Sequence, residues 1–238
     1  DTSAKMITAL LFLCIISTLA VLIHVGFYVG FGYLAKDVFF GEALSLYVVE
    51  LFLLISFILV FASAMVSGVV TLFRGDDGPV LMASPQYDIK PWIVFLRMFL
   101  SSLWPLLVVI VPALVAIYRV FTLSLSGFLL ALFSAIILVC IAVLGAMLVL
   151  FLTSAVLFSL NAFTKRHLLF LNIITFFGLL SVVWTRFHSV NLADFFQARI
   201  LSQTVPDLSP ILEQFHIFPS HLVSMVIYHG QHGAFTQS

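Results

Sequence analysis

The chain has 238 residues, of which 63% are hydrophobic and only 8% are charged, and its mean hydropathy is +1.25. A soluble domain carries about 25% charged residues, so this composition leaves too few polar side chains to cover a surface in water. It excludes a soluble enzyme, a nucleic-acid-binding domain and a disordered chain. The basic and acidic residues balance, and Cys14 and Cys140 lie inside apolar runs. We therefore expect an integral membrane protein whose first partner is the lipid bilayer, with no nucleic acid among its partners.

Five apolar segments are each long enough to cross a bilayer as a helix, which takes about 20 residues. They lie near residues 6–35, 44–73, 91–118, 125–161 and 167–185. Transmembrane strands would be about 10 residues long and would alternate apolar with polar positions, unlike these segments. The predicted fold class is therefore all-α: a polytopic integral membrane helical bundle of about five transmembrane helices with short interfacial helices.

The first and fourth apolar segments are both long. The first runs on past the apolar core of about 7–15 residues that a signal peptide has, so we interpret it as a retained helix. The fourth would be about 55 Å long as a helix, more than the hydrocarbon core, and must tilt, bend or project. Gly145 is either a bend point or a close-packing position within it, and we favour close packing.

Basic residues in the short loops predict the orientation. With the N-terminus inside, six basic residues fall on the inner side and four on the outer side. The inner group is Lys5, Arg74, Lys90, Arg97, Lys165 and Arg166; the outer group is Lys36, Arg119, Arg186 and Arg199. Residues 186–238 are more polar, and we expect them to form an interfacial or extracytoplasmic segment. Within it, Leu192–Leu201 has the pattern of a short amphipathic helix, and Leu222–Tyr228 is too short to span.

Motifs for catalysis and metal binding are not found in the sequence. It contains no P-loop pattern for ATP, no H-E-x-x-H and no G-x-S-x-G. We therefore predict no catalytic residue, no metal site and no cofactor on this chain. His229 and His232 have a spacing that could suit a metal, but Gly230 argues against a helix there, so we favour a polar interfacial tail.

Two ionisable residues lie within or beside the spans. His24 is interpreted as a residue that forms a hydrogen bond between helices, with a functional site as the alternative. Glu50 could relay protons, but we favour a position at the lipid–water boundary near a helix N-terminus.

The loop at residues 74–90, between the second and third spans, is the most distinctive part of the chain. Glycines and prolines break any continuous helix here, and Pro79–Ala83 could form a short helix on the inner membrane face. Such an element could press on a soluble partner. An ordinary loop with turn residues is the equal alternative.

The residues of this loop resemble the cytoplasmic coupling region of ABC-2-type exporter permeases. Phe73-Arg74-Gly75-Asp76 and Leu81-Met82-Ala83-Ser84-Pro85 carry the match. The proline-bearing stretch Ser102–Leu106 with Pro112, the run Ile141–Leu152, the basic Lys165-Arg166-His167 and the stretch Phe215–Ser220 resemble later parts of the larger permeases. In two places the chain departs from the family pattern, because Gln86-Tyr87-Asp88 follows the Ser-Pro and Gly78-Pro79 replaces a leucine-rich turn.

The resemblance implies a function for the chain. It would be the membrane-spanning permease subunit, an N-terminal half or part, of an ATP-driven exporter in a bacterial cytoplasmic membrane, with its N-terminus inside. ATP and magnesium would be bound by a separate ATPase subunit, and a second permease half or subunit would complete the path. The resemblance places the coupling contacts at Arg74, Asp76, Asp77, Leu81, Met82, Ser84 and Pro85.

Two alternatives belong to other classes. A structural or accessory subunit of a larger membrane complex would have no transport path of its own, and the scarcity of polar groups within the spans is compatible with that role. A membrane enzyme would need ionisable groups at one depth, which His24, Glu50 and Cys140 do not obviously provide.

Overall fold

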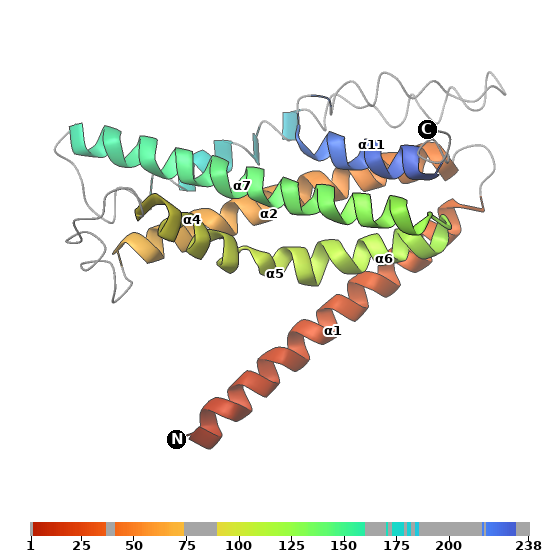
Figure 1. The fold of residues 1–238 in the computed structure, drawn as a ribbon, viewed down its shortest axis with the longest axis horizontal. Helices are drawn as coiled ribbons and strands as arrows, with labels where there is room; N and C mark the ends of the chain where they lie inside the picture. Colours follow the sequence, from red (N-terminus) through yellow and green to blue (C-terminus); the bar gives the residue numbers. More distant parts are fainter. Residues whose placement is uncertain are drawn as a thin grey trace. The chain divides into compact units, whose positions relative to one another are not determined.

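The computed structural model describes residues 2–36, 41–73, 90–159, 170, 173–178, 180–181, 184–185, 216 and 218–231, and all regular elements in these ranges are helices (Figure 1). This confirms the all-α class. In hydrocarbon each backbone amide and carbonyl needs a partner, and a helix supplies these partners within one segment.

Four helical segments are long and apolar enough to cross a membrane: Met6–Leu34, Ser45–Val70, Trp92–Val120 and Leu125–Val156. They correspond to the first four predicted spans. The predicted fifth span, residues 167–185, lies partly outside the described residues, and the parts that are described within it are helical. The count of five spans is therefore not confirmed.

Helix α1 (Thr2–Leu34) is apolar on all sides and packs through its C-terminal part. There it contacts α6 (Val111–Val120). The Phe27 ring lies 4.4 Å from that of Phe52, centroid to centroid, and the Phe31 ring lies 5.6 Å from that of Phe121. The N-terminal half of α1 extends away from α6 (Figure 1) with exposed leucine and isoleucine side chains. Such a surface suits lipid or an apolar partner.

Helix α2 (Gly41–Phe73) is the second span, and the third span follows it in several pieces. These pieces are α4 (Lys90–Ser101), α5 (Leu103–Pro105), the π-helix η1 (Leu106–Ile110) and α6. Proline has no backbone N–H, so Pro112 cannot donate to the carbonyl of Val108 one turn earlier. The backbone widens instead, and the Val111 N–H donates to the Leu106 carbonyl.

Helix α7 (Leu125–Ser159) is a single helix of 35 residues, or about 52 Å. Ser124 caps it, because its Oγ accepts a hydrogen bond from the Gly127 N–H at 3.1 Å. The helix continues through Gly145, where a Cβ atom would meet the Phe61 ring at 3.6 Å. This contact supports packing, not bending, as the role of Gly145.

Helix α11 (Ser220–Gln231) is the last described element. The prediction that Gly230 prevents a helix here is wrong, because α11 continues through Gly230 to Gln231. One glycine near a helix end costs only about 1 kcal/mol, and burial of Val223 and Ile227 outweighs that cost.

The chain divides into two compact units. The first unit comprises Asp1–Ser56, Trp104–Ile136 and Phe218–Ser238, and the second comprises Phe57–Leu103 and Ile137–Ile217. Each unit therefore contains parts of α2, α7 and the third span, and the boundary within the third span falls between Leu103 and Trp104, in α5.

Candidate functional site

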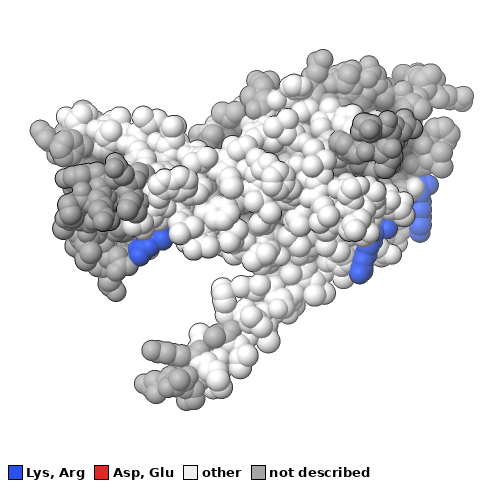
Figure 2. Space-filling model, viewed as in Figure 1, with Lys and Arg blue, Asp and Glu red and all other residues white. Residues whose placement is uncertain are grey.

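The surface of the described residues carries few charges. Figure 2 shows isolated basic side chains and no acidic side chain among the described residues on the face drawn. Glu50 is not part of this surface because it is fully buried in the first unit, 0% exposed. The prediction that Glu50 lies at the lipid–water boundary is therefore wrong. A buried carboxylate is stable only when partners replace its water, so its surroundings define the candidate site.

The partners of Glu50 come from the first turns of α11. His221 Nδ1 lies 2.5 Å from Glu50 Oε1, and Ser224 Oγ donates to the same oxygen. His221 and Ser224 are three residues apart, which places both side chains on one face of a helix. Because a carboxylate oxygen only accepts, His221 Nδ1 carries the proton of this bond when Glu50 is ionised.

The helix end itself favours a negative charge at this place. The first N–H groups of α11 have no partner within the helix, and their dipoles sum to a partial positive charge at its N-terminus. Glu50 reaches this end through His221 and Ser224. Three features therefore hold the carboxylate: an imidazole, a hydroxyl group and a helix N-terminus.

Two polar atoms of the cluster have no partner among the described residues. They are Glu50 Oε2 and Ser220 Oγ, and both are buried. Ser220 precedes Ser224 by one helical turn, so both hydroxyls lie on the α11 face that carries His221. An unpaired buried polar atom costs about 1–3 kcal/mol, and more when the group is charged. The cluster thus has unused hydrogen-bonding capacity at the carboxylate.

The other intramembrane histidine has a structural contact. His24 Nδ1 lies 3.0 Å from the carbonyl oxygen of Pro112, which links α1 to the third span at its proline. A carbonyl oxygen cannot donate, so Nδ1 carries the proton. The prediction that His24 forms a hydrogen bond between helices is confirmed.

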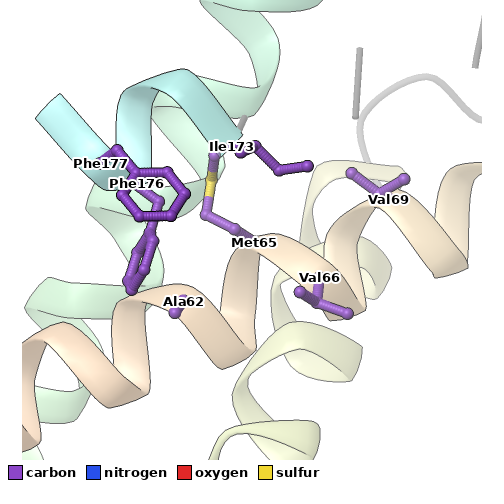
Figure 3. Close-up of a pocket in the computed structure, with 7 residues that line it drawn as sticks. All are labelled: Ala62, Met65, Val66, Val69, Ile173, Phe176 and Phe177. Carbon is purple, nitrogen blue, oxygen red and sulfur yellow. The ribbon is translucent and has the colours of Figure 1, made fainter. Parts of the chain in front are cut away.

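An apolar pocket of about 270 Å³ lies in the second unit. Figure 3 shows Met65 and its neighbours on α2 facing Ile173 and the two phenylalanines of the helical residues 173–178. Its lining consists of Ala62, Met65, Val66, Val69, Ile173, Phe176 and Phe177. None of these described lining residues has a polar side chain, so the lining suits hydrocarbon and not water.

The predicted coupling residues lie outside the described part of the chain. These are Arg74, Asp76, Asp77, Leu81, Met82, Ser84 and Pro85, between the end of α2 at Phe73 and the start of α4 at Lys90. The amphipathic helix predicted at Leu192–Leu201 and the basic cluster at Lys165–His167 also lie outside it.

The helices on either side of this loop are described, and they pack closely in the second unit. A Cβ atom on Gly68 of α2 would lie 2.8 Å from Leu150 Cδ2 and 3.1 Å from both Met98 Cε and Met98 Sδ. Only glycine allows this approach without movement of a neighbour. The two helices that bracket the loop are therefore in direct contact near its base.

Potential metal ligands do not cluster among the described residues. Among the described residues no three His, Cys, Asp or Glu side chains form a group that could hold a metal ion. His229 is described and exposed, whereas His232 lies outside the described residues.

Sequence reasoning missed His221 and Ser224 as partners of Glu50. His221 falls within residues 186–238, which are expected to form an interfacial or extracytoplasmic segment, but its side chain is buried. One signal was available: a carboxylate within an apolar run needs a donor. Ser220-His221 and Ser224 are polar residues on one face of an otherwise apolar segment.

Helices, spans and a charge-poor surface define a polytopic α-helical membrane protein. Comparison with family models is more specific: the chain belongs to the family described as "Putative ATP-binding cassette", whose model matches residues 3–238. No curated protein and no solved structure matches the chain.

Proposed function

We propose that this chain is the membrane-spanning permease subunit of an ATP-driven exporter of the ABC type. Membership of the family over residues 3–238 supports an association with ATP-binding cassette systems. The absence of a P-loop pattern in the sequence supports placing ATP hydrolysis on another chain. ATP and magnesium would bind to that ATPase subunit, and this chain would not be an enzyme.

The observation that carries the proposal is the contact between α2 and α4 at Gly68 and Met98. The loop at residues 74–90 joins the ends of these two helices. Packed interiors transmit displacement because they are close to incompressible. A partner that pushes on the loop would therefore move α2 and α4 together at this contact.

The third span offers a place where such a movement can be absorbed. After α4 the helix is interrupted at Ser102, whose N–H is shared between the carbonyls of Met98 and Phe99 at 3.0 Å each. The π-helix η1 follows, and its wider turn interrupts the regular backbone ladder. The loop would thus act as a lever and the region 102–110 as its hinge.

The proposed setting is a bacterial cytoplasmic membrane with the N-terminus inside, so that the loop at 74–90 faces the ATPase. A second permease half or subunit would complete the transport path. The alternative is an accessory subunit of a larger membrane complex, and the exposed apolar surface of α1 is compatible with either role.

The test begins with purification of the tagged chain in mild detergent and identification of its partners by mass spectrometry. We expect a P-loop ATPase among them. We then expect the variant Asp76→Ala/Asp77→Ala to lower ATP turnover of the complex several-fold. Asp37→Ala is the matched control, because Asp37 lies in the loop predicted on the opposite membrane side. Stable partners without an ATPase would contradict the proposal and favour the accessory subunit.

A further inference from the structure

The buried cluster around Glu50 plays no part in the proposed coupling, and its atoms indicate a separate role. Oε1 of Glu50 accepts from His221 and Ser224, whereas Oε2 is buried and has no partner among the described residues. We propose that the Glu50–His221 pair is a proton-binding site within the membrane. The proton adds to a lone pair on Glu50 Oε2: a new O–H bond forms there, while the O–H bond of the donating hydronium ion breaks and leaves water.

Charge balance supports this assignment. Ionised Glu50 with a neutral His221 leaves one negative charge in a buried site, and one proton makes the pair neutral. The described basic side chains of this unit do not neutralise it, because Lys36 and Arg119 are exposed. The N-terminus of α11 contributes only about half a positive charge. Burial of an unbalanced charge is costly, so uptake of one cation is favoured.

The donor set fits a proton better than a metal ion. Hard metal cations such as calcium and magnesium take about six or more oxygen ligands. The described oxygens of the cluster with spare capacity are Glu50 Oε2 and Ser220 Oγ. A proton needs one lone pair, which Oε2 has.

The titratable side chains near this pair include two tyrosines and one histidine. On α2, Tyr47 lies one turn before Glu50, and on α11, Tyr228 lies one turn after Ser224. Both are phenols, which carry no charge near neutral pH. On α1, His24 is bonded to the Pro112 carbonyl. The exchangeable proton of this cluster is therefore assigned to the Glu50–His221 pair.

Infrared spectroscopy of the full chain in lipid nanodiscs tests the proposal. We expect the C=O stretch of a protonated carboxyl group to rise and fall reversibly with pH. Glu50→Gln should abolish this band, whereas Glu42→Gln, a matched change in the same helix, should retain it. His221→Asn removes the imidazole partner and should change the pH range over which the band rises and falls.

A second measurement needs no variant, which covers the case in which Glu50→Gln does not fold. A hydrophobic carbodiimide reacts with protonated carboxyl groups in apolar surroundings. Peptide mass mapping of the treated wild-type chain should find Glu50 modified, with less modification as the pH rises. The proposal would be overturned by a Glu50 band that does not change with pH, by a band that responds to sodium in place of pH, or by labelling that spares Glu50. Neither measurement depends on the ATPase, so both separate this proposal from the exporter function.

Discussion

Glu50 on α2 and His221 on α11 lie 2.5 Å apart although 171 residues separate them in the sequence. The contact joins the second span to the last described helix by a bond between two buried ionisable groups. Its loss should therefore affect the stability of the first unit more than any exposed substitution.

Removal of His221 alone should be more damaging than removal of both partners. His221→Ala leaves the buried Glu50 carboxylate without its imidazole, and breaking a buried pair in this way costs about 3–5 kcal/mol. The double variant Glu50→Leu/His221→Leu leaves no charge to bury and should recover most of that loss. Thermal unfolding midpoints in detergent measure both. Equal midpoints for the two variants would show that the pair is not energetically coupled.

The loss of stability caused by a substitution at Gly68 should increase with the size of the introduced side chain. Gly68→Ala requires only that flexible ends of Leu150 and Met98 shift, so a loss of about 1 kcal/mol is expected. Gly68→Leu forces α2 away from its neighbours and should cost several times more. Gly26→Ala on α1 is the control, since its Cβ would meet no described atom within 4 Å. Thermal unfolding again provides the measurement, and equal losses at both glycines would argue against the close contact.

The turn that follows α6 contains a strained residue. Thr122 has a φ of 48°, a conformation that β-branched residues rarely adopt, and the Leu123 N–H closes the turn on the Tyr118 carbonyl. Thr122→Gly should therefore stabilise the chain by about 1 kcal/mol. Thr122→Val keeps the branched Cβ and should give no gain. A lower unfolding midpoint for the glycine variant would contradict the expectation.

The hydrogen bond from His24 to the Pro112 carbonyl should contribute modestly to the stability of the fold. Polar contacts between membrane helices are worth about 0.6 kcal/mol on average, with a maximum near 1.7. We expect His24→Leu to lower the free energy of unfolding by this amount. His24→Asn should lower it less, because Asn retains a donor near the position of Nδ1. Unfolding in a denaturing detergent titration can resolve the two. A loss of several kcal/mol would mean that His24 has a further role.

Hydropathy is sufficient to predict the helices because few backbone structures other than a helix can cross a bilayer. Apolar segments such as Ser45–Val70 and Leu125–Val156 are long enough to span, and backbone hydrogen bonding then requires a helix. The π-helix η1 was not predicted, although Pro105 and Pro112 indicated that the third span is irregular. Two prolines show where a helix is disturbed, but not whether it kinks or widens.

The candidate site was less predictable than the helices. His24 was correctly interpreted, because a lone intramembrane histidine most often bonds to a neighbouring helix. The sequence predicts Glu50 at the lipid–water boundary near a helix N-terminus and places His221 within the more polar residues 186–238, so it does not predict that the two meet. Their pairing depends on the packing of α11, which no local pattern encodes. The prediction at Gly230 failed for the same reason, since burial outweighed helix propensity.

The loop at residues 74–90 is proposed to contact an ATPase, and cross-linking from a single cysteine tests this contact most directly. Cys14 and Cys140 would first be replaced by serine, and then Ser84→Cys or the control Asp37→Cys introduced into the purified complex. We expect that a short reagent with one thiol-reactive and one photoreactive end joins residue 84 to the P-loop chain and that ATP alters the yield. Residue 37 should give no such product. Equal products from both positions, or no product from residue 84 in an active complex, would contradict the account.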